Sequence, residues 1–513
     1  MLGDPAPFRP TPFDLEVFES YVPPDHHLRK CLQVLDWDAF HEILAPFYAD
    51  IGRPSEPPVL MLKLEYLRYQ YNLSDRQVIE RAETDLAFRL FLQVDVYDTL
   101  VHPTSLCCFR GRLGIAGFRQ VFRQIVSQAR KHGLVKDRLR LKDATHVIAN
   151  IAVPSTLALV AQVRDQLLAA AEVFDPVRVE GERVNVQLLR ERTGEQKNEQ
   201  RLVARVTHLR EILAWVDLLT SPEDGSNDGA WQTLLECRQL AHKILRDQEH
   251  PDAGDHTRST VDPDVRRGKH GQWYDGYLLD ISMDADSELI TEINVLPANG
   301  AEAADAVQLI QQEEATHGND IEQLSIDGIG FNGPVLRELE DPEGLAVDTY
   351  VPPPKEAETD IFTPEDFVEA PEQGRVICPA GETSSYRQRD SRNRSSVHRF
   401  KRVTCDDCEL LSLCMSHPPQ GTFGKTVRKN DYQAEYDRAR QKATTAEYDE
   451  VRSEHPKVER KLGEVTNRHG GRRARYWGDG KVLIQELMSC TATNVKRVVR
   501  LICAPTSRLA REC

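Results

Sequence analysis

The sequence contains no run of eighteen apolar residues, which is about the length that a membrane-spanning helix needs. Its first residues, MLGDPAPFRPTPF, also lack the basic start and the apolar core of a secretory signal. The hydrophobic content of 40% and the charged content of 28% are typical of a soluble globular protein. We therefore expect a cytoplasmic protein without a membrane partner, and a length of 513 residues predicts about two to four domains.

Positive charge is scarce overall, because the formal net charge is −16, and this value alone argues against a nucleic-acid partner. The basic residues are nevertheless concentrated toward the C-terminus. Residues 457–513 contain 13 Lys and Arg against 5 Asp and Glu, and residues 387–402 contain seven basic residues and one acid. Such runs fit either a nucleic-acid surface or an ordinary solvated face.

Eleven cysteines in a cytoplasmic chain indicate thiols or metal ligands rather than disulfides. Metal-ligand spacing occurs in one place, within VICPAG and VTCDDCELLSLC. The four cysteines there are Cys378, Cys405, Cys408 and Cys414. They could hold a structural Zn²⁺ tetrahedrally and so close a small loop module that lacks its own core. His398 or His417 could replace one cysteine, and free buried thiols are the alternative.

The first part of the chain has a helical pattern, from about residue 25 to residue 134. Ser74 and Gln77 fit a capping box that opens a helix, with Leu73 available as a hydrophobic staple. This domain could bind DNA through a helix-turn-helix, or it could be a helical bundle without DNA contact. At about residue 138 the pattern changes to a strand with Asp143 in its middle, and a long helical block follows over 156–250.

Residues 275–296 predict a hairpin of two strands around the polar turn at 284–287. Asn299 is expected to cap a helix over 301–316, and the next strand, over 321–326, ends at Asp327. Strand, hairpin, helix and strand is the order of the ribonuclease H-like fold, an α/β fold with a mixed sheet and helices. In that topology the first and fourth of these strands are neighbours, which would bring Asp143 and Asp327 together.

The pattern as a whole predicts eight segments. They are an extended N-terminal segment (1–25), a helical N-terminal domain that could bind DNA (26–135), a ribonuclease H-like core in two first parts (136–155 and 256–345), a helical insertion (156–255), an acidic Pro-rich linker (346–375), a zinc-ribbon-like cysteine module (376–420), a helical return with the third catalytic acid (421–505) and a tail (506–513).

Asp143 and Asp327 would repel each other if both were ionised, unless a divalent cation compensates them. Mg²⁺ suits such a site because it takes hard oxygen ligands and leaves positions for phosphate and water. A third acid from a helix nearby would complete a two-metal site for attack on a phosphodiester. The candidates for it are Glu459, Glu464 and Glu486. Spacing favours Glu459, since Arg460 and Lys461 follow it at once and suit a phosphate.

Two other groups of cations could contact DNA. Arg266 and Lys269 precede the hairpin, where a solvated loop is an equal alternative. Arg472, Arg473 and Arg475 are mixed with Tyr476 and Trp477 in the last loop, and this mixture suits an unpaired base near a cut end. Structural packing of the two aromatic residues is at least as plausible.

Several blocks of the sequence resemble bacterial insertion-sequence DDE transposases, more narrowly the subgroup with an InsH-type N-terminal domain and a cysteine-containing insertion. These blocks are LKDATHVIAN, DPDVRRGKHGQWYDGYLLDISMDADSELITEINVLPAN, SIDGIGFNG and HPKVERKLGEVTNRHGGRRARYWGDGKVLIQ. NLSDRQVIERAETDLAFRLFL and HPTSLCCFRGRLG resemble the opening helical domain of that family. The blocks stand in the family's order along nearly the whole chain.

The resemblance implies a ribonuclease H-like domain whose Asp143, Asp327 and Glu459 bind two Mg²⁺ ions, with Mn²⁺ as an alternative. It implies cleavage of double-stranded DNA at a transposon end and attack of the freed 3′-hydroxyl on target DNA. It also implies a homodimer on paired DNA ends, in the bacterial cytoplasm at the nucleoid. Phe331 and Thr104 depart from the family pattern. An inactive or domesticated DNA-binding protein, or a ribonuclease H-like nuclease without strand transfer, is the alternative.

Overall fold

The computed structural model describes residues 1–2, 8–221, 227–355, 361–370, 374–417, 419 and 421–504. The chain divides into two compact units. The first unit comprises residues 1–137, 142–319 and 456–513, and the second comprises residues 138–141 and 320–455. Strand β1 (Leu139–Ile148) contributes residues to both units.

The first unit opens with a helical domain. Its elements are α1 (Pro12–Tyr21), α2 (His27–Val34), α3 (Ala39–Leu44), η1 (Ala45–Phe47), α4 (Pro58–Gln70), α5 (Asp75–Thr84), α6 (Leu86–Leu92) and α7 (Pro103–Lys131). The predicted capping box at the start of α5 is confirmed, because Ser74 Oγ accepts from the Gln77 amide and the Gln77 side chain accepts from the Ser74 amide. Trp37 packs on Tyr66 and Phe91 in the centre of this domain.

A six-stranded sheet has the order β2-β3-β1-β5-β6, with β4 paired to β3. Its other strands are β2 (Arg266–His270), β3 (Gln272–Asp284), β4 (Ile290–Pro297), β5 (Gln323–Ile326) and β6 (Asp348–Tyr350). The long strand β3 pairs with β2 through residues 272–276 and with β4 through residues 277–283, both antiparallel. The predicted hairpin is therefore confirmed, and so is the expected neighbourhood of β1 and the strand that ends at Asp327.

The approach of β3 to β1 requires a glycine. A Cβ atom at Gly276 would lie 2.0 Å from the carbonyl oxygen of Val147. Any larger residue would push the two strands apart at the end of β1, so the sheet that positions Asp143 depends on this residue.

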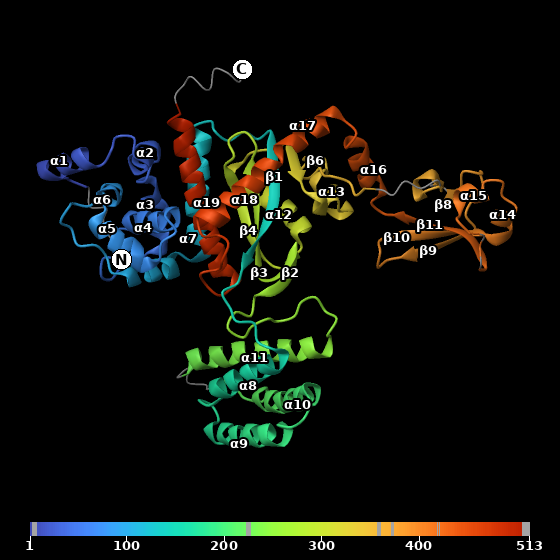
Figure 1. The fold of residues 1–513 in the computed structure, drawn as a ribbon, viewed down its shortest axis with the longest axis horizontal. Coiled ribbons are helices and arrows are strands. Elements are labelled where there is room, and N and C mark those ends of the chain that lie inside the picture. Colours follow the sequence, from blue (N-terminus) through green and yellow to red (C-terminus); the bar gives the residue numbers. More distant parts are fainter. Residues whose placement is uncertain are drawn as a thin grey trace. The chain divides into compact units, whose positions relative to one another are not determined.

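Three helices cover the sheet in the first unit. They are α7, α12 (Glu302–His317) and the C-terminal α19 (Asp479–Ile502), and each of them packs on β4. Figure 1 shows α7 and α19 lying alongside each other. The buried carboxylate of Glu292 on β4 pairs with Arg119 and Arg123 of α7, which fixes that helix to the sheet. Helix α18 (Pro456–Arg468) is joined to α19 by the loop that contains Arg472, Arg473 and Arg475.

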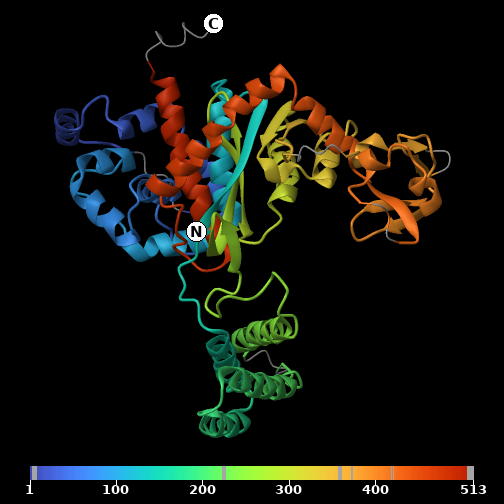
Figure 2. The ribbon, with the colours of Figure 1, turned by 45° about the vertical axis from the view of Figure 1, so that its right-hand side comes forward.

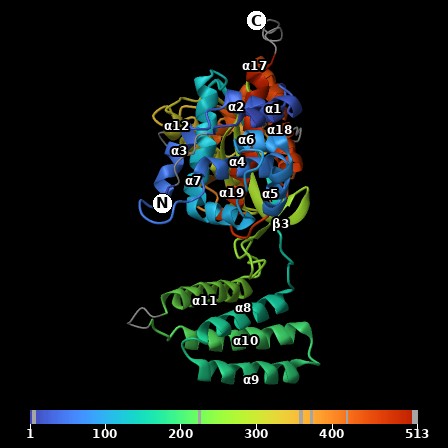
Figure 3. The same ribbon diagram turned by 90° about the vertical axis from the view of Figure 1, so that its left-hand side faces the viewer.

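The predicted helical block after β1 is confirmed as four helices, α8 (Thr156–Ala171), α9 (Pro176–Thr193), α10 (Asn198–Val216) and α11 (Asp228–Glu249). They lie against one another (Figure 3) and enclose a hydrophobic core of their own. Leu167, Leu209 and Ile244 are among its fully or almost fully buried members.

The second unit contains β5 and β6, two small sheets and several helices. Three of the helices lie outside its cysteine-bearing part: α13 (Gly333–Leu339), α16 (Gln433–Lys442) and α17 (Ala446–Glu454), and η2 (Gly328–Gly330) precedes them. Strands β5 and β6 are parallel. Phe331 stacks on Tyr436, which joins the loop after η2 to α16.

The cysteine-bearing part of this unit, residues 361–430, is drawn in orange in Figure 2. It contains η3 (Pro364–Asp366), β7 (Val368–Ala370), β8 (Arg375–Ile377), β9 (Tyr386–Asp390), β10 (Ser395–Lys401), α14 (Arg402–Asp406), α15 (Leu411–Cys414) and β11 (Phe423–Asn430). The strands form one sheet of order β11-β10-β9 and a separate β7–β8 pair.

Two local expectations fail. Asn299 does not cap α12, because its side chain donates to the carbonyl oxygen of Gly254 and the helix begins after Ala301 without a side-chain cap. The segment that composition marks as a linker contains strand β6, which pairs with β5. A strand of three residues is too short to leave a period in the sequence.

Candidate metal centre

Asp143 lies in the middle of β1, between residues that are buried on both sides. Its own side chain is half-buried, and Oδ1 accepts a hydrogen bond from the amide of Ala144 at 2.8 Å. The carboxylate therefore has access to solvent although the strand around it belongs to the core.

Asp327 follows directly after β5, as expected, and its carboxylate accepts a hydrogen bond from the amide of Ile329 at the start of η2. Arg452 of α17 holds the end of this strand, since its guanidinium donates to Ser325 Oγ at 2.9 Å and to the carbonyl oxygen of Ile326 at 2.7 Å. Gly330 has no room for a side chain because a Cβ there would lie 2.7 Å from Ile326 Cγ2.

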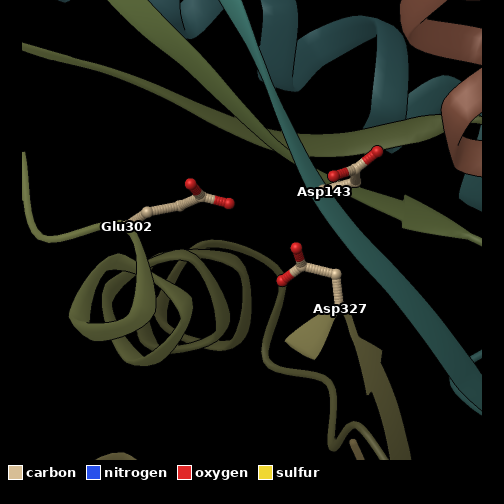
Figure 4. A group of neighbouring side chains, drawn as sticks. All are labelled: Asp143, Glu302 and Asp327. Atoms are coloured by element: carbon tan, nitrogen blue, oxygen red, sulfur yellow. The ribbon is translucent and has the colours of Figure 1, made fainter. Parts of the chain in front are cut away.

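Glu302, the first residue of α12, is the third acid at this place. One carboxylate oxygen from each of Asp143, Glu302 and Asp327 lies within 4.8 Å of the other two (Figure 4). All three side chains are half-buried. Among the residues that the structure describes, no other group of three His, Cys, Asp or Glu side chains meets this spacing.

A buried lysine supports Glu302. Lys142 is almost completely buried, and its ammonium group lies 3.3 Å from Glu302 Oε1 and 3.0 Å from Asp280. It also donates to the carbonyl oxygen of Glu302 at 3.1 Å, at the start of α12. Burial opposes the charged form, but the two carboxylates outweigh it and raise the pKa of Lys142. The cation therefore holds the first turn of α12 beside β1.

The three glutamates that the sequence offers as the third acid lie in different surroundings. Glu459 is exposed in the first turn of α18 and does not belong to the group in Figure 4. Glu464 forms ion pairs with Lys496 at 2.6 Å and with Lys461 at 3.4 Å. Glu486 is completely buried in α19. Glu459 as a metal ligand stays a prediction.

Glu302 is absent from the candidates that the sequence suggested. The sequence predicts the helix that Glu302 opens, but the residue it singles out at that start is Asn299. The signal that could have found Glu302 is topological, since a helix that follows the hairpin in this fold begins beside the first strand. An acid in its first turn then points at Asp143.

The chemistry of this donor set suits a hard divalent cation. Three carboxylates this close repel one another strongly when they are ionised, and a bound divalent ion removes that repulsion. Oxygen ligands and partial access to solvent are what Mg²⁺ and Mn²⁺ prefer, because part of the coordination shell remains for water and phosphate. The residues therefore fit the metal-dependent chemistry that the sequence predicted.

Of the basic residues next to Glu459, one is exposed and the other is not. Arg460 is exposed, 4.0 Å from Glu288. Lys461 is buried and faces Glu464 and Glu288. Arg460 is therefore the one of the two that could meet a DNA phosphate without rearrangement.

The arginines of the last loop differ in the same way. Arg472 donates to the carbonyl oxygen of His146 at 2.9 Å, and Arg475 donates to that of Leu73 at 2.9 Å. Arg473 has an exposed side chain, while the backbone around it pairs with Ile148 at the end of β1. Arg472 and Arg475 thus hold this loop to β1 and to the N-terminal helices.

The aromatic residues in this loop and the cations before the hairpin also have partners. Tyr476 lies against the guanidinium groups of Arg68 and Arg110, which agrees with the alternative that this aromatic residue has a structural packing role. Trp477 is exposed, and its indole nitrogen donates to the carbonyl oxygen of Asn150.

The two cations in β2 differ, since Arg266 is paired with Asp255, whereas Lys269 is exposed beside Trp273. DNA binding by these residues stays a prediction.

The four cysteines with metal-ligand spacing, Cys378, Cys405, Cys408 and Cys414, are reduced and half-buried. They line one small cavity in the second unit. Cys513, for which no ligand role is expected, lies outside the described residues.

Comparisons with known proteins match both ends of the chain. A family model described as "Transposase domain (DUF772)" matches residues 16–112, which are the helices from α1 to the first part of α7. A second, described as "Transposase DDE domain", matches residues 377–499, from the first of the four cysteines to α19. Glu459 lies inside the second match, whereas the three clustered carboxylates lie outside both.

One similar curated protein is an uncharacterized protein, ORF8 in the nfe locus of Rhizobium meliloti. It is 25% identical to this chain over 136 residues, a stretch that covers 25% of this chain and 66% of that protein. None of the described helices is long and apolar enough to cross a membrane. With a transposase model matching each end and a mixed α/β, ribonuclease H-like core between them, the predicted resemblance to DDE transposases of the insertion-sequence type is confirmed.

Proposed function

We propose that this protein cuts DNA at the ends of a transposon and joins the freed 3′-hydroxyl to target DNA. The observation that carries the proposal is the group of Asp143, Glu302 and Asp327, whose carboxylate oxygens lie within 4.8 Å of one another. The two transposase family matches support it independently.

Asp143 and Asp327 would hold Mg²⁺, with Mn²⁺ as an alternative, and Glu302 is the third ligand that the geometry favours. Bound there as a pair, the ions would activate the attacking oxygen and stabilise the leaving oxygen of a phosphodiester. Glu459, which spacing and family resemblance favour, would approach from α18 when DNA is bound. Lys142 orients Glu302, and Arg452 fixes the strand end that carries Asp327.

The rest of the proposal concerns partners and domains. Exposed cations near both ends of the sheet, among them Arg460, Arg473 and Lys269, would contact the phosphates of double-stranded DNA. The N-terminal helices would bind transposon ends, and the cysteine-bearing part would be an insertion in the catalytic fold, as in the InsH-type subgroup. Pairing of two ends requires two active sites, so we propose a homodimer on DNA, in the cytoplasm at the nucleoid.

The test is cleavage of a labelled fragment that carries the inverted repeat flanking the gene, with Mg²⁺ and with EDTA. We expect nicking by the wild type only with Mg²⁺, and a loss of at least about a hundredfold in Asp327→Ala. Glu199→Gln, on the exposed face of α10, is the control and should cut as the wild type does. Equal nicking by wild type and Asp327→Ala would show that the metal centre lies elsewhere.

Two further arms separate the alternatives. Glu302→Gln and Glu459→Gln, assayed side by side, identify the third acid as the one whose loss abolishes cutting. A supercoiled target plasmid distinguishes a transposase from a nuclease, because only a transposase yields a product in which the labelled end is joined to the plasmid. Tight binding without cutting by the wild type would favour the inactive DNA-binding alternative.

A further inference from the structure

The cysteine-bearing part of the second unit has a very small hydrophobic core. Its hydrophobic core cluster consists of Phe367, Val376, Phe400 and Val427. Cys378, Cys405 and Cys414 pack against this group. Four apolar side chains bury too little surface to fix several short strands and two short helices, and small modules of this kind usually depend on a metal or on disulfides. The cysteines here are free thiols.

All four cysteines line one cavity of about 30 Å³, which is large enough for a single ion. They come from three separate segments, the turn after β8, the α14 region and the end of α15. Neither His398 nor His417 lines this cavity. His398 lies on β10 with its ring beside Ser384 Oγ, so the structure favours an all-cysteine ligand set over a mixed one.

The backbone forms a tight turn at two of the places that carry the cysteines, after Cys378 and between Cys405 and Cys408. After Cys378 the chain turns back, with the Gly381 amide donating to the Cys378 carbonyl oxygen at 2.8 Å. Gly381 has a φ of +85°, which a glycine adopts without strain. The amide of Cys408 donates to the Cys405 carbonyl oxygen at 3.3 Å, closing the Cys-x-x-Cys turn.

Strand β11 closes the cavity from the other side. The amide of Lys425 donates to Cys405 Sγ at 3.4 Å, a contact that stabilises a thiolate ligand. The side chain of Lys425 donates to the Cys414 carbonyl oxygen at 2.6 Å. Gly424 permits this approach, because a Cβ there would lie 2.4 Å from Cys405 Sγ.

From this arrangement we infer that Cys378, Cys405, Cys408 and Cys414 bind one structural Zn²⁺, with Gly424 and Lys425 as its supporting residues. No three of these sulfur atoms lie within 4.8 Å of one another, so binding draws them inward around the cavity. Four thiolates leave no open position on the metal, and the site therefore has no part in the proposed DNA chemistry. The ion would hold together the turn after β8, the α14 region and α15. These segments belong to the same part of the chain as the β11-β10-β9 sheet, which carries Arg387, Arg389 and Arg399.

The experiment measures metal content by mass spectrometry in the full-length protein, purified without a histidine tag and with a non-chelating reductant. We expect about one zinc per chain in the wild type and less than about a fifth of that in Cys408→Ser and Cys414→Ser. Cys237→Ser on α11 and Cys503→Ser after α19 are the controls and should keep their zinc. Well under one zinc in the wild type, or unchanged zinc in Cys408→Ser, would overturn the inference.

A second readout covers the case in which the serine variants fail to fold. Wild-type protein stripped of metal and reloaded with Co²⁺ should show the intense visible absorption of tetrahedral thiolate coordination. Co²⁺ absorption typical of octahedral oxygen coordination, iron in place of zinc, or a disulfide between two of the four cysteines would each contradict a zinc site.

Discussion

Glu486 is a carboxyl group buried completely among the apolar residues of α19. Burial raises its pKa to about 8, although Arg475 and Gln485 oppose the shift. A Cβ atom at Gly471 would lie 2.6 Å from its Oε2, so the backbone of Gly471 packs directly against the carboxyl group. In the unfolded chain the same group titrates near 4.5. Between about pH 4.5 and pH 8, the Glu486 carboxyl group keeps its proton in the folded state and loses it in the unfolded state.

Stability should therefore fall as the pH rises from about 4.5 to about 8, and Glu486→Gln should remove this loss. At pH 7 we expect the variant to be more stable than the wild type by about 3 kcal/mol, and at pH 4.5 the two should be equal. Urea unfolding across this pH range measures the difference. Glu450→Gln, on the exposed face of α17, is the control and should change stability little at any pH. A difference that does not depend on pH would contradict the assignment.

Arg110 belongs to a buried ion network that joins α4, α5 and α7. Its guanidinium pairs with Glu65, which is completely buried, and with Asp75. Arg110→Met should destabilise the protein by about 3 kcal/mol, because Glu65 then keeps only Arg68 as a partner. Thermal unfolding measures the loss. Arg112→Met, where the exposed guanidinium lies over the ring of Tyr48, should cost less than about 1 kcal/mol.

At the scale of single residues, the sequence predicted two of the three clustered carboxylates. Asp143 and Asp327 were recognisable because an acid inside or directly after a buried strand is costly without a ligand. Glu302 was not, because an acid in the first turn of a helix is common and stabilising for ordinary reasons. Only the pairing of β1 and β5 and the contact with Lys142 give it a place near the other two.

Among the elements, long periodic ones were predictable and short ones were not. The hairpin, the helical block and the strand ending at Asp327 all carry a clear period in the sequence. Strands β2 and β6 do not, because β2 (RRGKH) contains no apolar residue and β6 has only three residues, so neither shows alternation of apolar and polar positions. The cap of α12 was missed because Asn299 finds a carbonyl partner outside the helix.

Helix α7 is interrupted at Gly114, whose φ of 53° and ψ of −164° only glycine adopts readily. The kink follows the residues of the N-terminal family match, which end at 112. Gly114→Ala should destabilise the protein by about 1 to 3 kcal/mol through backbone strain alone, since a Cβ there would meet nothing within 4 Å. Gly111→Ala, in the regular helix and equally open, should be neutral or stabilise by up to about 1 kcal/mol. Equal changes in the free energy of unfolding for Gly114→Ala and Gly111→Ala, measured in urea, would argue against a kink at Gly114.

Across the first unit, the two ends of the chain are folded together. Helix α19 packs on α2, α4 and α7 as well as on β4, and it is buried along most of its length. His469 and Arg475 add hydrogen bonds to backbone carbonyl groups of Tyr69 and Leu73. Residues of the two family matches thus meet in one core. Composition and periodicity cannot reveal this, because the contacts join residues about four hundred positions apart.

The helical block α8–α11 differs, since its core is made of its own residues. We therefore expect a fragment of residues 155–251 to be monomeric, helical by circular dichroism and cooperative in urea unfolding. A fragment of residues 8–134 should lack cooperative unfolding or aggregate, because without α19 the apolar faces of α2, α4 and α7 are exposed to water. The fragment that should lack cooperative unfolding is the longer of the two, so a small size does not explain a difference. Cooperative, monomeric unfolding of residues 8–134 would show that the N-terminal helices do not need α19 and that the shared core is dispensable to them.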